Sequence, residues 1–179
     1  MSFEFIELNI KGTFRIIPRI FGDSRGYFTE TYKTSDFESK GIAGDFRQDN
    51  QSFSKKGVLR GLHFQRYPHA QGKLVRVVKG KIFDVGVDIR KNSPNYGNYI
   101  SAILSEENME MLWIPEGFAH GFLALEDSVV LYKATNEYNK ESEDGIIWDD
   151  PSIAVKWPEL PTEISPKDKG WPTLKKLEM

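Results

Sequence analysis

The sequence predicts an all-β sandwich or barrel with a few short helices, and three observations support this fold class. Short stretches that alternate between apolar and polar residues follow one another at near-regular spacing between residues 46 and 135. Glycine, proline and asparagine residues separate these stretches, as is typical of strands joined by turns. The alternation is clearest from Phe83 to Ile89, where every second residue is apolar. Because 179 residues match one ordinary domain, we expect a single domain over residues 1–179.

The part of the chain before residue 46 predicts strands and one short helix. Residues 3–14 alternate loosely, and residues 15–21 predict a short strand in which Pro18 marks either a sheet edge or the end of the strand. A glycine-bounded turn leads into residues 27–32, whose period of two predicts a strand that lines a pocket. Cap-forming residues open a short helix at residues 35–40, and a glycine ends it.

Strands dominate from residue 46 to residue 135. We expect them at residues 46–53, 58–65, 72–78, 81–89, 99–104, 110–114, 121–125 and 129–135. A single helical turn is expected at residues 105–108. The proline-rich tail, about residues 150–179, has little periodicity, so we expect it to wrap the body with a short helix or turn near Ser165.

Composition excludes several classes of function. The net charge of −2, from 24 basic and 26 acidic residues, gives no general attraction for nucleic acid or for an anionic membrane. The chain has no cysteine, so it has neither a disulfide framework nor thiolate chemistry. The N-terminus lacks the basic start and apolar run of a signal peptide, and no stretch is long and apolar enough to span a bilayer. We therefore expect a cytoplasmic protein that binds neither membrane nor nucleic acid.

Two spacings in this β-rich chain are similar to those of the cupin jelly roll. They are Gly57 followed by His63, and the Pro-x-Gly-x-x-His segment that ends at His120. Metal-binding cupins hold their ion with a His-x-His pair, a nearby Glu and the later His, but the residue two after His63 is Gln65, whose amide is a poor ligand. A metal site would have to recruit His69 instead. We therefore expect no metal.

His63 is the best candidate for a general base, because imidazole titrates near neutrality. A core histidine held by a carboxylate is the competing interpretation. Two cations favour the base: Arg60 lies three residues earlier and Lys73 follows a nearby glycine. One cation could bind an anionic group, while the other stabilises an oxyanion that forms when a proton leaves carbon.

Six segments closely resemble the dTDP-4-dehydrorhamnose 3,5-epimerase family, and the resemblance extends from about residue 14 to residue 169. The segments are Gln48–Ser52, Val58–Gln65, Gln71–Arg76, Phe83–Arg90, Trp113–Phe122 and Tyr132–Thr135. The resemblance implies a cupin-type jelly roll, a homodimer, a dTDP-4-dehydro-6-deoxy sugar substrate and no cofactor. The implied reaction inverts C3 and C5 of dTDP-4-dehydro-6-deoxy-D-glucose, the carbons beside the C4 ketone. The product is dTDP-4-dehydro-6-deoxy-L-mannose, on the way to dTDP-L-rhamnose.

The resemblance also implies roles for individual residues. His63 matches the base, Asp168 the carboxylate that orients it, and Tyr132 the acid on the opposite sugar face. Lys73 would stabilise the oxyanion on C4 together with His120. The residues matched to substrate binding are Arg25, Phe28, Glu30, Gln48, Asp49, Asn50, Arg60, Tyr138, Glu143 and Lys167. Guanidinium groups suit a diphosphate through bidentate, charge-assisted bonds.

Two positions and one segment of the tail depart from the family pattern. Ser24 stands where the family often has Glu, Tyr27 replaces a common Phe, and Gly170-Trp171-Pro172 forms an unusual tail. Nothing in the sequence explains Trp171, and Asp168 depends on how this tail packs.

Three other functions stay open at the level of sequence. An enzyme of the same superfamily could invert one centre, C3 or C5. A non-catalytic cupin could bind a sugar nucleotide, and a metal-dependent cupin could act as an oxygenase or isomerase. Tyr132 favours the double inversion over the single one.

Overall fold

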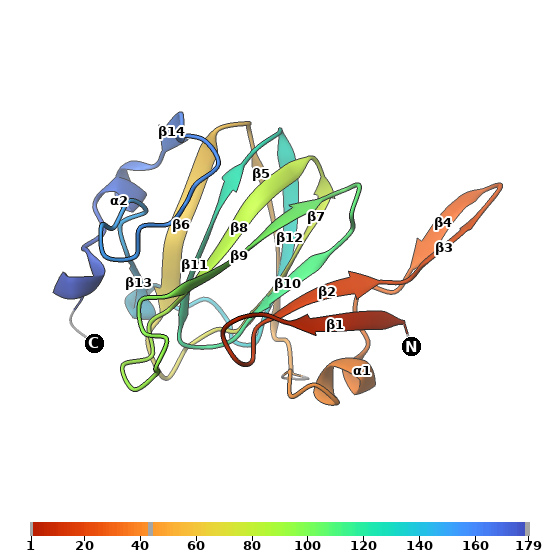
Figure 1. Ribbon diagram of the computed structural model, residues 1–179, viewed down its shortest axis with the longest axis horizontal. Helices are drawn as coiled ribbons and strands as arrows, with labels where there is room; N and C mark the ends of the chain where they lie inside the picture. Colours follow the sequence, from red (N-terminus) through yellow and green to blue (C-terminus); the bar gives the residue numbers. More distant parts are fainter. Residues whose placement is uncertain (1, 43–44, 178–179) are drawn as a thin grey trace.

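A computed structural model describes residues 2–42 and 45–177 of the chain. Over these residues two six-stranded sheets pack against each other, and a two-stranded hairpin projects from one end of the body (Figure 1). The predicted all-β fold class is confirmed. No helix in the described ranges is long and apolar enough to cross a membrane.

The first sheet brings together the N-terminus and the middle of the chain. Its strands, in spatial order, are β1 (Phe3–Glu7), β2 (Phe14–Pro18), β10 (Met111–Ile114), β7 (Lys73–Lys79), β12 (Ser128–Ala134) and β5 (Gln48–Ser54). Neighbouring strands are antiparallel throughout. Adjacent strands therefore come from distant parts of the sequence, as in jelly rolls.

The second sheet has the order β13, β6, β11, β8, β9, and β14 pairs with β6 in parallel. The bounds are β13 (Glu143–Gly145), β6 (Val58–Gln65), β11 (Phe118–Ala124), β8 (Lys81–Asp88), β9 (Tyr99–Ser105) and β14 (Glu163–Ile164). The hairpin consists of β3 (Ile20–Asp23) and β4 (Gly26–Thr29). The helices are α1 (Thr34–Glu38) and α2 (Pro166–Lys169), with 3-10 turns η1 (Lys140–Ser142) and η2 (Leu174–Lys176).

The interior between the sheets is closely packed. Val75, Ile82, Ile100, Leu112 and Val130, from five different strands, are at most 1% exposed in one contiguous cluster. Each such side chain stabilises the fold by roughly 1.5–3 kcal/mol through burial of apolar surface. This rigid interior fixes the strands that carry the candidate site.

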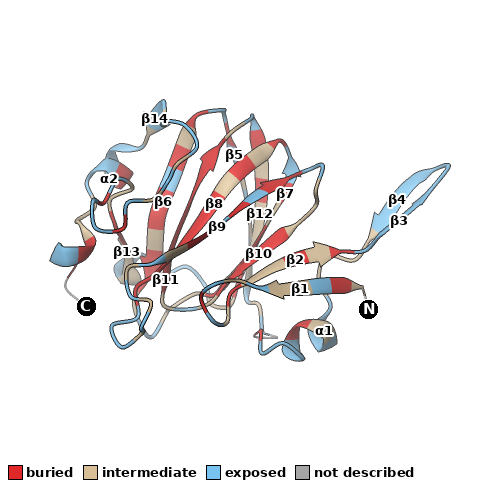
Figure 2. Cartoon of the chain, in the orientation of Figure 1, coloured by how far each residue is buried: buried red, intermediate tan, exposed pale blue. Residues whose placement is uncertain are grey.

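The C-terminal segment covers the outer face of the second sheet. Val85 and Val87 of β8 are fully buried there, packed with Ile153, Leu174 and Leu177 of the tail. The predicted alternation of β8 is therefore real, but both of its faces are largely buried, and Figure 2 shows β8 as red with tan segments. The opposite face of β8 points into the interior. The tail thus holds the second sheet from outside.

On the outer face of the first sheet, α1 covers one end. Phe37 of α1 is fully buried and contacts the rings of Phe3, Phe5 and Tyr32. The rest of this face is open, and Phe53 of β5 is 53% exposed on it.

The local predictions have mixed outcomes. Residues 27–32 were expected to line a pocket, but β4 pairs with β3 in the projecting hairpin, where the residues of both strands are largely exposed (Figure 2). Residues 105–108 form the expected single helical turn: the Met109 amide donates to the Ser105 carbonyl at 3.0 Å, and the Asn108 side chain also bonds the Ser105 backbone. β13 and β14 were not predicted, because strands of three and two residues carry no detectable alternation.

Candidate active site

A histidine–carboxylate pair lies on β6, the strand between β13 and β11 of the second sheet. The Nε2 atom of His63 on β6 is 2.6 Å from the Oδ1 atom of Asp168 on α2. The His63 side chain is 31% exposed, whereas that of Asp168 is 5% exposed. Burial opposes ionisation of Asp168, but the hydrogen bond and charge of His63 outweigh it and lower the pKa of the carboxyl group. The second oxygen, Oδ2, accepts a hydrogen bond from the Gly61 amide at 3.3 Å.

A short helix places this carboxylate. Ser165 is the N-cap of α2, and its hydroxyl accepts a hydrogen bond from the Asp168 amide at 3.0 Å. Pro166 occupies the first helical turn, where its missing amide hydrogen costs nothing. The expected turn near Ser165 therefore exists, and it delivers Asp168 to His63.

A β-bulge brings Arg60 to the same side as His63. Residues three apart on a regular strand point to opposite faces. Here the register of β6 against β11 shifts between the pairs His120–His63 and Phe122–Arg60. At the bulge Gly61 has φ +138, and a Cβ atom on it would lie 2.5 Å from the Cα atom of Gly121. The shift lets Arg60 and His63 line one cleft.

The cleft has a volume of about 490 Å³ and lies between the β5–β6 connection and α2. Its lining includes Lys55, Arg60, His63, Lys167 and Asp168. The Nε of Arg60 donates to the hydroxyl of Ser54 at 2.8 Å, and its Nη2 donates to the carbonyl of Phe53 at 3.0 Å. Three cations and a base thus share an open cleft, an arrangement suited to a polyanionic substrate.

A second histidine–carboxylate pair lies deeper. The Nε2 of His120 on β11 is 2.7 Å from the Oδ1 of Asp84 on β8, and both side chains are at most 8% exposed. Burial lowers the pKa of His120, and the charges of Lys73 and His63 add to this, although Asp84 opposes it. His120 therefore stays neutral near pH 7. It pairs directly with His63 in the register of β6 and β11, so the two pairs are neighbours.

The first sheet contributes Lys73 and Tyr132 to this region. The environment of the Lys73 ammonium group lowers its pKa to about 8, chiefly through burial, against the opposing charges of Asp84 and Glu143. Its Nζ atom lies 5.8 Å from the centre of the Tyr132 ring. Burial raises the pKa of Tyr132, and the charge of Arg60 opposes the shift, so the phenol is protonated at neutral pH.

The rim of the site is a chain of polar contacts. The Tyr138 hydroxyl donates to Glu143 at 2.8 Å, and Glu143 pairs with the Lys167 ammonium at 2.5 Å. The Gln48 amide oxygen accepts from the Tyr138 backbone at 2.7 Å, and its nitrogen donates to Asn50 at 2.8 Å. Five of the sequence-predicted binding residues are therefore linked to one another.

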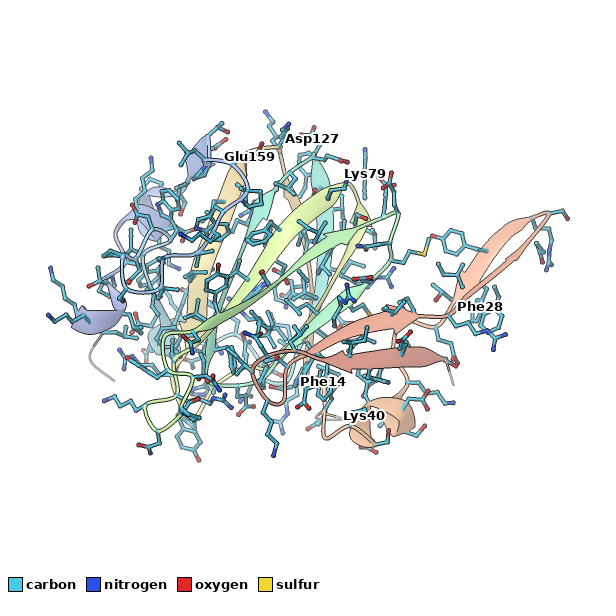
Figure 3. The ribbon with its side chains drawn as sticks, viewed as in Figure 1. Phe14, Phe28, Lys40, Lys79, Asp127 and Glu159 are labelled. Atoms are coloured by element: carbon cyan, nitrogen blue, oxygen red, sulfur yellow. The ribbon has the colours of Figure 1, made fainter. Side chains whose placement is uncertain are left out.

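Other predicted binding residues lie elsewhere in this chain. Arg25 and Phe28 lie on the projecting hairpin, and Figure 3 shows Phe28 far from the strands of the second sheet. Arg25 pairs with Asp23 at 2.5 Å at the exposed hairpin turn. Glu30 follows the hairpin at its base. Asp49 is exposed and pairs with Lys133 at 2.9 Å on the outer face of the first sheet.

Gln65, the amide in place of a metal ligand, joins two loops. It donates to the carbonyl groups of His69 at 2.6 Å and Glu137 at 3.1 Å, and accepts from the Asn139 amide at 2.7 Å. The His69 ring contacts the Ser142 hydroxyl at 2.9 Å. Within residues 2–42 and 45–177, no three His, Asp or Glu side chains are grouped as a metal site.

Sequence reasoning did not select Asp84. A signal for it existed, because a carboxylate within an alternating apolar strand must either face solvent or have a buried partner. Both faces of β8 are buried, and Asp84 has His120 as its partner.

Comparison with known proteins identifies the family of the chain. The sequence profile of the dTDP-4-dehydrorhamnose 3,5-epimerase family matches residues 7–176. The chain belongs to this family. An enzyme of that name from Methanothermobacter thermautotrophicus is 51% identical over 178 residues, which cover 97% of this chain and 96% of the relative.

Solved structures of family members superimpose closely on the chain. The crystal structure of the 3,5-epimerase from Sulfolobus tokodaii has a TM-score of 0.93 at 50% identity, covering 99% of this chain and 98% of that one. The Legionella pneumophila enzyme, solved in complex with dTDP-4-keto-L-rhamnose, has a TM-score of 0.94 at 44% identity, covering 98% and 95%. The fold is thus the predicted cupin-type jelly roll.

Proposed function

We propose that this 3,5-epimerase family member inverts C3 and C5 of dTDP-4-dehydro-6-deoxy-D-glucose to give dTDP-4-dehydro-6-deoxy-L-mannose, a step toward dTDP-L-rhamnose. The observation that carries the proposal is the His63–Asp168 pair at the wall of a cation-lined cleft. The C4 ketone acidifies the neighbouring C–H bonds. The protein therefore needs to supply a base, a stabiliser for the enolate and an acid on the other sugar face.

His63 is the proposed base. Neutral His63 accepts the proton from carbon, and the positive charge that it gains is balanced by ionised Asp168 at 2.6 Å. The carboxylate also fixes the ring, because a hydrogen bond at Nε2 leaves Nδ1 as the free acceptor. The same atom is then able to return a proton or release it to solvent.

The enolate oxygen on C4 is the proposed partner of Lys73 and His120. Lys73 brings a positive charge into a largely dry region, where its attraction for a developing oxyanion is far stronger than in water. His120 is neutral, and Asp84 sets which of its nitrogen atoms carries hydrogen. These two groups are fixed before the reaction, so little reorganisation is needed when charge develops.

Tyr132 is the proposed acid. It lies on the first sheet, whereas His63 lies on the second, so the two groups approach a sugar between them from opposite sides. Its pKa is raised, which keeps the proton available for transfer to the enolate carbon. Inversion requires this opposed placement, because removal and return of a proton on one face would restore the substrate.

Arg60, Lys55 and Lys167 are proposed to bind the diphosphate, and Gln48, Asn50, Tyr138 and Glu143 the sugar nucleotide. Their support is the shared cleft and the linked rim. Tyr138 is 52% exposed, which leaves its ring face open to a base.

A homodimer is also proposed. Phe21, Tyr27 and Phe28 are each 45–65% exposed on the hairpin, and a groove of about 380 Å³ lies on the open outer face of the first sheet. Apolar surface of this extent favours a partner copy that covers it and receives the hairpin. Arg25, Phe28 and Glu30 would then serve the neighbouring site. Sedimentation at equilibrium tests the dimer.

Incubation with dTDP-4-dehydro-6-deoxy-D-glucose in deuterated water tests the reaction. We expect solvent deuterium at both C3 and C5, which mass spectrometry and NMR detect. We also expect the activity to be retained in the presence of a chelator. Exchange at one carbon would indicate a single-centre epimerase, and exchange at neither would contradict the proposal.

Tyr132→Phe separates the acid from the base. The variant should keep deuterium exchange at the carbon that His63 reaches, while net inversion falls by about 10²-fold because the acid is missing. NMR of the sugar measures both. Retained inversion would assign the acid to another residue.

A further inference from the structure

Trp171, which the sequence left unexplained, lies next to the His63–Asp168 pair. Its ring centre is 6.3 Å from that of His63, with the planes at 70°. The indole rests on the backbone of Gly145, where a Cβ atom would come within 2.5–2.7 Å of three ring atoms. Gly145 is itself paired with His63 in the sheet. The indole thus occupies a fixed place against the strand that carries the base.

A cation also contacts the indole ring. The Lys167 ammonium group lies 5.6 Å from the ring centre, and Glu143 holds that ammonium group in an ion pair. The carbonyl of Pro172, the next residue, accepts a hydrogen bond from the Ile147 amide at 2.9 Å. These contacts fix the position of Trp171, although it lies close to the C-terminus.

The indole N–H is the unusual feature. The Nε1 atom is buried and has no hydrogen-bond partner of normal geometry among the described residues. It nevertheless lies close enough to Asp168 to contribute to the lowered pKa of that carboxyl group. An unpaired buried donor costs stability, so a phenylalanine at this position would suit the resting fold better.

We propose that Trp171 is a positioning residue whose indole N–H acts on the Asp168 carboxylate when His63 takes up a proton. In the resting state Asp168 is held by His63 and by the long 3.3 Å bond from Gly61. When the imidazolium forms, a donor from Trp171 keeps the carboxylate ionised and oriented. The stability that the unpaired N–H costs at rest is regained in the charged intermediate. This inference rests on the proposed function, in which His63 is the base.

Trp171→Phe is the decisive variant, and Trp157→Phe is its matched control. Trp157 lies in the tail and packs on Phe83 of β8, and its indole N–H donates to the carbonyl of Trp148 at 3.1 Å. We expect Trp171→Phe to lower kcat by about tenfold without lowering the melting temperature, because the interaction of the indole N–H with Asp168 is weak at rest and strengthens in the reacting state. Trp157→Phe should lower the melting temperature and leave kcat unchanged. Equal melting and equal kcat of Trp171→Phe and wild type would overturn the proposal.

The titration of Asp168 distinguishes positioning from packing. Without the indole donor the pKa of Asp168 rises, so its carboxyl group should titrate at higher pH in Trp171→Phe than in wild type, which NMR of the labelled carboxyl carbon measures. The charged groups around Asp168 that stay in place are His63, Lys55, Arg60, Glu143, Glu163 and Lys167. An unmoved titration of Asp168 with reduced kcat would indicate packing alone and overturn the proposal.

A double-mutant cycle and NMR complete the test. In an Asp168→Asn background, Trp171→Phe should have no further effect on kcat, whereas additive losses would overturn the proposal. The indole N–H resonance that disappears in Trp171→Phe should shift with pH in wild type and stay unshifted in Asp168→Asn. This resonance needs no substrate. Absence of deuterium exchange by wild type would instead contradict the proposed function, so the two failures are distinguishable.

Discussion

Two histidine–carboxylate pairs of nearly equal length lie side by side in this protein, and they differ in burial and in the origin of the carboxylate. His63 and Asp168 are 2.6 Å apart at the wall of an open cleft, and their carboxylate comes from a short helix far along the chain. His120 and Asp84 are 2.7 Å apart in the interior, on adjacent strands of one sheet. Hydrogen-bond length alone therefore does not identify the base.

The difference in burial separates what each pair is able to do. His120 is buried, its pKa is lowered, and it serves best as a neutral donor of fixed orientation. His63 keeps contact with the cleft, and Asp168 stays ionised beside it, so a charge formed on the ring is balanced. One pair is built to change charge and the other to keep it.

The largest expected effect is the loss of the open base. His63→Ala should lower kcat by about 10³-fold, because general base catalysis is removed. His120→Ala should lower kcat by about tenfold but reduce the free energy of unfolding by about 3 kcal/mol, since Asp84 is left buried and unpaired. Steady-state kinetics and urea denaturation measure the two quantities. Equal kinetic losses would mean that the two pairs are not functionally distinct.

Substitutions of the two carboxylates, Asp168 and Asp84, should show the same contrast between the pairs, with smaller effects on kcat and stability. Asp168→Asn should lower kcat by about 10²-fold, because an amide cannot balance the imidazolium. The lowered pKa of Asp168 stabilises the fold above the unfolded value of about 3.9, and this contribution is lost as pH falls through the folded value. Stability of Asp168→Asn and wild type should therefore converge toward low pH.

For the buried carboxylate, Asp84→Asn should reduce the free energy of unfolding by about 1–3 kcal/mol and kcat by less than tenfold. Urea denaturation at several pH values compares Asp84→Asn and Asp168→Asn with wild type. Persistent divergence of Asp168→Asn from wild type near pH 2 would contradict the linkage to Asp168.

The strands of the site were predictable from the sequence, because alternation reports burial along a strand. The expected strand at residues 58–65 matches β6, and Arg60, His63 and Lys73 were selected before their positions were known. Their common cleft was not predictable, because a regular strand separates Arg60 from His63. The glycine-dependent bulge that unites them is a property of two strands together.

The tail and the hairpin mark the other limits of prediction. Asp168 reaches His63 only through contacts distant in sequence, and no local pattern reports them. The residues of β4 alternate like a pocket-lining strand, yet the hairpin lies in the open. Alternation predicts a strand and its two faces, but not which molecule covers them.

A smaller effect is expected at Lys73, whose positive charge lies near the buried His120–Asp84 pair. Lys73 has a pKa of about 8, so the ammonium group is lost as pH rises through that value and the rate should fall with it. Lys73→Arg keeps a positive charge above pH 8, and its basic limb should therefore move to higher pH. Profiles of kcat between pH 6 and 10 check this. An unchanged limb would assign it to another group.

The smallest effect is expected outside both pairs, at Asp49. Its neighbours Gln48 and Asn50 are hydrogen-bonded to each other at the rim, whereas Asp49 points to the outer face and pairs with Lys133. An exposed ion pair contributes at most about 1 kcal/mol, so Asp49→Asn should change stability little and kcat by less than about twofold. Asn50→Ala is the matched variant on the inner face and should raise KM. A tenfold change in Asp49→Asn, measured with sedimentation in parallel, would mean that this face reaches a site across the dimer.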